Sequence, residues 1–448
     1  MKKIVETIKN IWSIEDLRSR ILFTLFILAV YRLGSFVVIP GVDPSQLAAL
    51  KANTDDGLLG LLNMFTGGAF ANASIFALGI MPYISASIVI QLLGMAIPYF
   101  QKLQKEGESG RRKINSITRY LTILICAGQA PGYIATQITS NPGVVPDASG
   151  LWWFTAVLVL ITGTIFVMWL GERITDRGIG NGISLLIMIG IIAGLPQSLI
   201  NEFILSAGGS KAGGLVLFMV EMATLLIVIM VSILLVQGTR RIPVQYAKRV
   251  IGNKQYGGVR QFIPLKVNAA GVMPIIFAQA IMFVPLTLAG FADSSDISNW
   301  FLREFSKFDG FWYNFTFFIM VVLFTYFYTA ITVNPNQMAD DMKKNGGFIP
   351  GIKPGRATSE YLDAVMSRIT FPGSLFLGFV AILPAFAMIL FKMDMGFAQF
   401  YGGTSLLILV AVVLDTLQQI ESHLLMRHYD GLMDSGRIKG KSSGNNMM

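Results

Sequence analysis

The sequence contains few residues of the types that catalysis and metal binding require. Its 448 residues include one cysteine, Cys126, and two histidines, His423 and His428. One cysteine cannot form an internal disulfide, and the histidines lack the surrounding cluster of ligands that a metal site needs. A phosphate-binding Gly-x-x-x-x-Gly-Lys-Ser/Thr loop, a His-Glu-x-x-His pair and a Ser, His and Asp set are also missing. These absences predict a protein that is not an enzyme and has no catalytic residues, metal or cofactor.

Charged residues are scarce too, at 14%, whereas 53% of the residues are hydrophobic and the mean hydropathy is +0.61. In a soluble domain, about a quarter of the residues are charged. Apolar stretches such as "ILFTLFILAV" (21–30) lie in runs of roughly 20 residues, which is the length that a helix needs to cross a bilayer. The composition therefore predicts an all-α membrane protein with several spans. No small-residue cleavage site follows the first run, so we expect a retained span and not a signal peptide.

The apolar runs predict about ten spans, near 20–39, 73–96, 118–137, 151–171, 182–199, 214–237, 269–290, 312–333, 371–391 and 403–426. An even number of spans places both chain ends on one side. If that side is the cytoplasm, it carries 29 of the 35 Lys and Arg residues. Cytoplasmic loops are enriched in Lys and Arg, so we expect the terminal segments 1–19 and 427–448 to be cytoplasmic.

Ionisable residues within these spans are few. They are Arg32 and Lys392 near span ends, together with Glu221, Asp415 and Glu421. An ion-coupled or proton-coupled transporter needs a relay of such groups inside the membrane. The sequence therefore disfavours a transporter, and any energy for moving a substrate is expected to come from a partner.

One apolar stretch, "LLNMFTGGAFANASIFALGI" (61–80), is broken in a way that an ordinary span is not. Residues 57–68 would rise only about 18 Å as a helix, against a hydrocarbon core of about 30 Å. Gly67 and Gly68 allow a turn, and Asn72 or Ser74 can cap the helix that follows. We expect a re-entrant half-helix that enters from outside and turns into the second span. The alternative is a hydrophobic external loop packed on the bundle.

Spans two and seven are both interrupted by prolines and polar residues, which weaken them as membrane helices. Pro82 interrupts span two, and Pro274 and Pro285 interrupt span seven, with polar side chains close by. In span two, Ile80, Ile84 and Ile88 recur every four residues and form one aliphatic face. Weakened spans at corresponding places in two halves suggest inverted repeats with a working interface between them.

Two long segments between spans, 238–268 and 334–368, are expected on the cytoplasmic side. The first is basic, interleaved with Tyr246, Tyr256 and Phe262, and its valines and isoleucines suggest a short hairpin. The second carries both charge signs and is punctuated by Pro and Gly. Loops of this length are usually functional or disordered. A solvated loop that only sets topology, or an RNA-binding loop, are the alternatives.

Six motifs resemble the SecY/Sec61-alpha family of protein-conducting channels. They are "GSFVVIPGVD" (34–43), "MFTGGAFANASIFALGIMPYISASIVIQLL" (64–93), "KEGESGRRKINSITRY" (105–120), "LGERITDRGIGNGISLLI" (170–187), "LKVNAAGVMPIIFA" (265–278) and "YGGTSLLILV" (401–410). The resemblance implies two inverted five-span halves, 20–199 and 200–426, around a pore in the bacterial cytoplasmic membrane. It implies secretion of unfolded polypeptides through the pore and lateral insertion of membrane proteins. A motor-independent insertase or a secondary transporter is the alternative.

The resemblance also implies roles for individual residues. The pore ring, which forms the constriction, would be Ile80, Ile84, Ile187, Ile276 and Ile408. The plug that closes the resting channel would be 57–68, with Leu58, Leu59, Leu61, Leu62, Met64 and Phe65 and the hinge residues Gly67 and Gly68. A lateral gate between spans two and three on one side and seven and eight on the other would be lined by Ser85, Ser87, Gln91 and Asn268.

Partners follow from the same resemblance. It implies the small membrane subunits SecE and SecG, the motor ATPase SecA, the ribosome and its RNA, signal sequences and nascent chains, and membrane lipid. The docking residues for motor and ribosome would be Arg240, Arg241, Lys248, Arg249, Lys353 and Arg356. Many family members have Gly-Ile-Arg-Pro-Gly where this chain has Lys353 at 351–355, and Lys keeps the charge but loses the bidentate fork of Arg.

Overall fold

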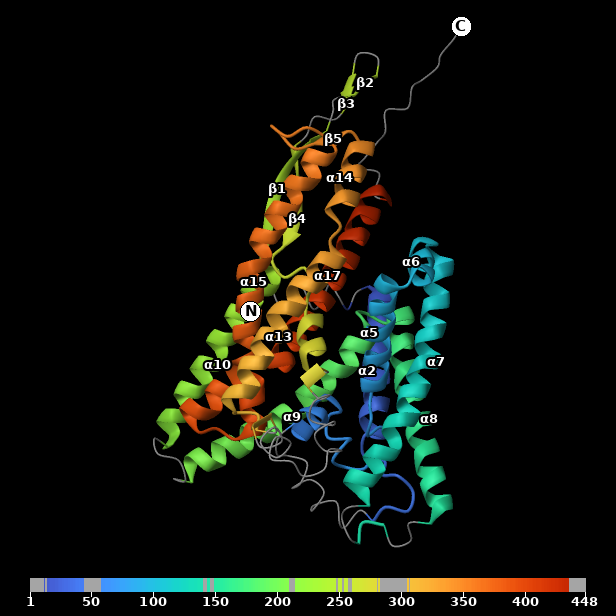
Figure 1. Ribbon diagram of the computed structural model, residues 1–448, viewed down its shortest axis with the longest axis vertical. Helices are drawn as coiled ribbons and strands as arrows, with labels where there is room; N and C mark the ends of the chain where they lie inside the picture. Colours follow the sequence, from blue (N-terminus) through green and yellow to red (C-terminus); the bar gives the residue numbers. More distant parts are fainter. Residues whose placement is uncertain are drawn as a thin grey trace.

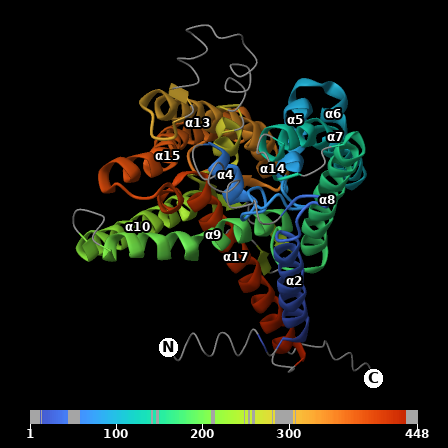
Figure 2. The ribbon, with the colours of Figure 1, turned by 90° about the horizontal axis from the view of Figure 1, so that it is seen from below.

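Long helices dominate the computed structural model of the chain (Figure 1). The structure describes residues 12, 14–43, 58–139, 143–145, 149–208, 214–246, 249–251, 254–256, 260–279, 281–282, 304–305 and 307–434. Seen from below in Figure 2, α5 to α8 lie on one side and α10, α13 and α15 on the other, with α4, α9 and α17 between them. The bounds of these helices follow.

The first half of the chain contributes α2 (Glu15–Gly34), α4 (Leu58–Phe65), α5 (Met81–Ala96), α6 (Pro98–Lys105), α7 (Glu108–Tyr133) with the π-helical turn η2 (Ile134–Ile138), α8 (Gly150–Arg177) and α9 (Gly182–Ala207). Local caps define two of the starts. The Ser149 side chain accepts a hydrogen bond from the Trp152 amide before α8, and the Asn181 side chain accepts from the Ile183 and Ser184 amides before α9. Side-chain oxygens at this position satisfy amides that have no partner within the helix.

The second half contributes α10 (Gly214–Gln237), α13 (Phe311–Thr332), α14 (Pro335–Lys344), α15 (Arg356–Phe391), α16 (Met395–Ala398), the 3-10 turn η3 (Gln399–Tyr401) and α17 (Gly403–Asp434). The 36 residues of α15 rise about 54 Å, well beyond the thickness of a bilayer core. The predicted span 371–391 is therefore only the second part of a helix that begins fifteen residues earlier, at Arg356.

Six described helices are long and apolar enough to cross a membrane, and the bent pair α5 and α6 would add a seventh. Helices α2 and α7 overlap two further predicted spans, 20–39 and 118–137. Of the predicted span 269–290, residues 269–279 and 281–282 are described, and 280 and 283–290 lie outside the described residues. The membrane-protein class is confirmed, and the count of ten spans stays a prediction.

The second span begins later than its apolar composition predicts. Residues 66–80 form a series of turns, and α5 starts only at Met81 with Pro82 in its first turn, where proline is well tolerated. The prediction that Asn72 or Ser74 caps the helix is wrong. Ile80 is the N-cap, and the Ser74 hydroxyl accepts a hydrogen bond from the Phe76 amide at 3.0 Å.

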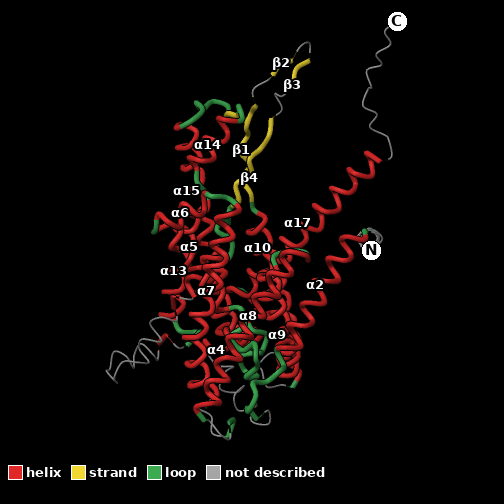
Figure 3. The backbone as a smooth tube through the Cα atoms, turned by 90° about the vertical axis from the view of Figure 1, so that its right-hand side faces the viewer, coloured by secondary structure: helices red, strands yellow, loops and turns green. Residues whose placement is uncertain are grey.

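A small sheet extends beyond one end of the helical bundle (Figure 3). Strand β1 (Thr239–Tyr246) pairs antiparallel with β4 (Arg260–Lys266), and β5 (Gly347–Phe348) pairs with the other edge of β1. Strands β2 (Arg249–Ile251) and β3 (Lys254–Tyr256) form a separate two-stranded ladder. The predicted hairpin is confirmed. The segment 334–368 is less loop-like than predicted, because α14 and the start of α15 occupy most of it.

Buried and exposed residues alternate along β1, and the buried ones attach the sheet to the helices. Ile242 and Val244 are buried, whereas Arg241 before them and Pro243 between them are exposed. The buried pair packs in a cluster that includes Leu362 on α15. A strand with one buried face has a fixed register, so the exposed side chains are displayed in a fixed orientation.

Candidate functional site

Five isoleucines from distant parts of the chain meet in one apolar cluster. Ile80, Ile187 and Ile408 are 7%, 7% and 3% exposed, and the partly buried Ile84 and Ile276 pack against the same cluster. They come from the start of α5, from α9, from the helical residues 273–279 and from α17. These are the five predicted pore-ring residues, and the fold brings all of them together.

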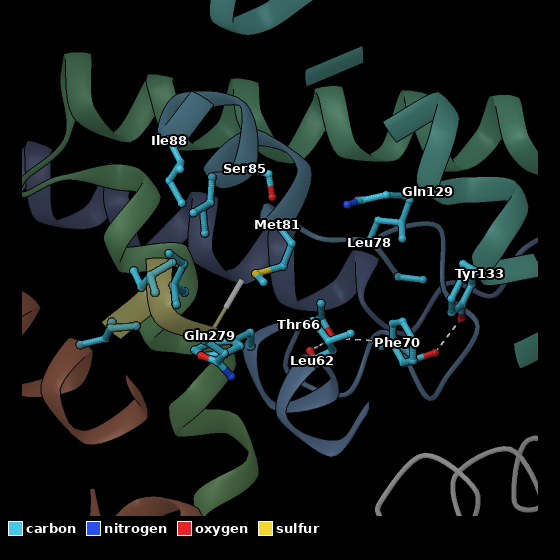
Figure 4. Close-up of a pocket in the computed structure, with 16 residues that line it drawn as sticks. Leu62, Thr66, Phe70, Leu78, Met81, Ser85, Ile88, Gln129, Tyr133 and Gln279 are labelled. Carbon is cyan, nitrogen blue, oxygen red and sulfur yellow. Dashed lines mark hydrogen bonds between the residues drawn. The ribbon is translucent and has the colours of Figure 1, made fainter. Parts of the chain in front are cut away.

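A cavity of about 340 Å³ lies beside this cluster, between α4 and α5. Four of the ring residues line it, with Ile80 adjacent in the cluster, and Leu62 and Phe65 of α4 complete part of its wall. Figure 4 shows Met81 and Ser85 of α5 on one side of the space and Leu62 and Thr66 on the other. The lining is mostly apolar, and apolar cavities exclude water.

Helix α4 has eight residues and rises only about 12 Å. Gly67 and Gly68 follow it with φ angles of +64° and +88°, in the left-handed region that favours glycine. Met64 and Phe65 contact the isoleucine cluster, and the Ser405 hydroxyl of α17 lies 3.4 Å from the Met64 sulfur. The side chains of Leu58, Leu59 and Leu61 lie outside the described residues, although α4 itself includes these positions.

Gly190 on α9 is a site residue that the sequence did not reveal. A Cβ at this position would lie 2.5 Å from the Phe65 carbonyl oxygen and 3.3 Å from the Gly67 amide nitrogen. Any larger residue would push α4 away from α9. Only a structure shows this close approach, because nothing local distinguishes Gly190 from the other glycines of a membrane helix.

The segment that follows the hinge is held by hydrogen bonds to other parts of the chain. The return segment, residues 69–80, bonds to the stretch that follows α2, with the Ile39 amide 2.9 Å from the Ala73 carbonyl and the Ile75 amide 2.9 Å from the Val37 carbonyl. The Tyr133 hydroxyl also donates to the Phe70 carbonyl at 2.7 Å, as drawn in Figure 4. These bonds anchor the return segment to residues 37–39 and to α7, and the Ala71 amide also donates to the Asn63 side chain of α4 at 3.0 Å.

The predicted gate residues do not form one group. Gln91 on α5 accepts a hydrogen bond from the Tyr328 hydroxyl on α13 at 3.2 Å, which links the two sides of the molecule. Ser85 lines the cavity, and Ser87 is half-buried. Asn268 is 8% exposed, and its Oδ1 has no hydrogen-bond partner among the described residues. Tyr328 was missed, because a tyrosine in an aromatic-rich span has no distinguishing sequence pattern.

The predicted docking cations that the structure describes belong to β1, β2 and the segment at the start of α15, and Figure 1 shows these strands at one end of the molecule. Arg240 and Arg241 on β1 are exposed, as is Lys353 in the turn before α15. Arg356 is exposed and pairs with Glu360 at 3.0 Å, within its own helix. Lys248 lies outside the described residues, and Arg249 is described only as part of β2.

Comparison with known proteins decides the family. The SecY family model matches residues 74–417, most of the chain. The protein translocase subunit SecY of Streptomyces galbus is 47% identical over 429 residues, covering 93% of this chain and 97% of the relative. The chain belongs to the SecY family. This SecY-family member is therefore a protein-conducting channel subunit of a translocase and not an enzyme.

Solved structures show the same fold for this SecY-family chain. One, of a SecY protein whose plug domain is described as stabilising the closed state of the channel, has a TM-score of 0.61 and 18% identity, covering 90% of this chain and 92% of the other. Another, canine Sec61 in a ribosome–channel complex, has a TM-score of 0.53 and 16% identity over 90% and 92% of the two chains. The apolar helices and the bacterial relatives identify a multi-pass protein of the cytoplasmic membrane.

Proposed function

We propose that unfolded polypeptides cross this channel through a constriction formed by the pore ring, Ile80, Ile84, Ile187, Ile276 and Ile408. The observation that carries the proposal is their convergence in one cluster from four separate segments of the chain. A narrow ring of aliphatic side chains excludes water and ions when closed. The same side chains make only weak, non-directional contacts, so they close around a passing chain without binding it.

Helix α4 acts as the plug of the resting channel. In support, Phe65 belongs to the same cluster as the ring, and Met64 packs against it. The eight-residue helix cannot span the membrane, and the two left-handed glycines after it provide a hinge. Because residues 37–39 and Tyr133 also hold the return segment, residues 69–80 can stay in place when α4 swings out and Asn63 releases the Ala71 amide.

The lateral gate opens between α5 and α13. The hydrogen bond from Tyr328 to Gln91 supports this position, since it joins the two helices that must separate. A neutral hydrogen bond contributes about 0.5–1.5 kcal/mol, which a signal sequence or an entering span offsets with its own contacts. Lipid then receives the apolar segment.

The exposed cations of β1 and of the turn before α15 form the docking surface for SecA or the ribosome, and both termini lie on that cytoplasmic side. Arg240 and Arg241 are exposed near the start of β1, which follows the end of α10 at Gln237, and Lys353 is exposed just before α15. Positive charge concentrated in the loops of one side supports the orientation. SecE-like and SecG-like subunits and ribosomal RNA are the further partners that family membership suggests.

Deletion of residues 58–66 tests the plug. The deletion removes α4 and keeps the return segment, so the channel should assemble, translocate and select signals less strictly. Reconstituted channels should open frequently to ions where the intact protein stays closed. Replacement of 58–66 by nine Gly and Ser residues is the matched control for loop length and should leak equally. A deletion variant that is degraded, or that stays as silent as the intact channel, would contradict the plug.

A further inference from the structure

The last turn of α2 reaches the hinge that follows the plug helix. Arg32 donates a hydrogen bond from Nη1 to the carbonyl of Gly67. The adjacent Tyr31 donates from its hydroxyl to the carbonyl of Thr66 at 3.5 Å, a long contact of low strength. Two consecutive residues of α2 therefore hold two consecutive carbonyls of the hinge.

The charge of Arg32 suits this position. Thr66 and Gly67 directly follow α4, at the end of the helix where unpaired carbonyls carry partial negative charge. A cation at the C-terminal end of a helix is stabilising, and hydrogen bonds from a charged donor such as a guanidinium are about twice as strong as neutral ones. A charged residue inside a span is costly and is usually retained for a function.

The fit around Gly67 is close on two sides. A Cβ at Gly67 would lie 2.8 Å from Nη1 of Arg32 and 3.0 Å from the Cα of Gly190. Helix α9 therefore supports the hinge from one side and Arg32 holds it from the other. Displacement of α4 has to break the contact between Arg32 and Gly67.

Arg32 also has a second partner that does not belong to the plug. Its guanidinium carbon lies 4.9 Å from the ring centroid of Phe36, a cation–π arrangement. Phe36 follows α2 and lies outside α4 and its hinge. When the hinge moves away, the guanidinium keeps this contact, so release of the plug does not leave the charge without a partner.

We propose that Arg32 is a latch that holds the plug helix closed through the Gly67 carbonyl. The proposal rests on the assignment of α4 as the plug. The latch acts on the closed state alone, so its loss should favour opening and leave the passage of polypeptide unchanged. A hydrogen bond from a charged group shifts an equilibrium by about ten- to a hundredfold. We expect an increase of that size in the ratio of open to closed channel for Arg32→Gln.

The test measures ion leak of reconstituted channels carrying Arg32→Gln, in the full-length chain and in the chain lacking 58–66. Arg32→Gln should leak in the full-length chain and add less than twofold in the deletion, because Gly67 remains there but the plug helix that the latch holds closed is gone. Arg20→Gln is the matched control. It removes a charge from the same helix, where Arg20 pairs with Asp16 at 3.3 Å, and it should leave the leak unchanged.

The outcomes separate the latch from the plug. If the deletion leaks and Arg32→Gln stays closed, the plug stands and the latch is wrong. If the deletion does not leak, the plug itself is wrong. If Arg32→Gln raises the leak by the same factor in both backgrounds, Arg32 supports the fold of α2, and the latch is again wrong.

A second measurement covers the case in which Arg32→Gln fails to assemble. Met64→Cys and Ser405→Cys report whether α4 is seated, because the native side chains lie 3.4 Å apart at Oγ and Sδ. The one native cysteine, Cys126, is replaced by Ala to leave this pair alone. Arg32→Lys keeps the charge and loses the fork, and it should reduce cross-linking by a short thiol reagent severalfold. Cross-linking equal to that of the parent chain would overturn the latch.

Discussion

Substitution of Ile408 by Asn tests the pore ring at a residue whose burial allows the loss of closed-state stability to be calculated. Ile408 is 3% exposed and lines the cavity beside α4. Removal of a buried isoleucine side chain forfeits about 1.5–3 kcal/mol of apolar burial in the closed state. An Asn in this position favours water in the constriction, which further weakens closure. We take about 2 kcal/mol as the net loss, which corresponds to about a 30-fold increase in the open fraction.

Planar-bilayer recording of the reconstituted channel measures this open fraction directly. A parallel assay measures export of a substrate with a defective signal sequence, which should rise. Ile408→Leu is the matched control, because it keeps volume and apolarity and should leave both readouts nearly unchanged. Val413→Asn introduces the same polar group on the same helix at a 37% exposed position outside the ring. Equal leak from Ile408→Asn and Val413→Asn would refute the ring.

Three further predictions address the gate and the docking surface. Tyr328→Phe removes the hydrogen bond to Gln91 and keeps the ring, so signal selection measured with weak signal sequences should relax by about three- to tenfold. Reversal of Arg240 and Arg241 to Glu should weaken SecA and ribosome binding, most strongly at low salt, with normal membrane insertion; binding that is unchanged across a salt series would exclude this surface. Lys353→Arg should support translocation in a reconstituted assay and Lys353→Glu should not, and equal rates would remove Lys353 from the surface.

The spans were largely predictable from the sequence because a bilayer imposes a simple length and polarity rule on each helix. The half-helix before Gly67 was predictable for the same reason, since twelve residues cannot cross the core. The start of α5 was not predictable. Residues 66–80 are apolar enough for a helix, but their backbone pairs with residues 37–39 instead, and such non-local bonds leave no periodic trace in the sequence.

The site residues also divide into those that the sequence predicts and those that it does not. The five isoleucines could be identified by resemblance, because they lie in motifs that match the family. Gly190 and Tyr328 could not, since their importance comes from a close backbone approach and from a partner 237 positions away. Arg32 was noticed as a charge in a span, but its partner is a backbone carbonyl, which the sequence does not reveal.

The length of α15 was also underestimated. Its first fifteen residues are polar and follow a Pro- and Gly-rich stretch, which is typical of a loop. They are helical because Leu362 and Met366 pack against the β1–β4 hairpin, so tertiary contacts override the local pattern.

Site-specific photo-cross-linking to a polypeptide arrested during translocation tests the central proposal most directly. A photoreactive residue is placed in turn at Ile84, Ile276 and Ile408, and at the 74% exposed positions Val216 and Leu390 on the outer surfaces of α10 and α15. The arrested chain should cross-link from all three ring positions and from neither outer position. Cross-links from Val216 or Leu390 in the absence of any from the ring would contradict passage through the isoleucine constriction.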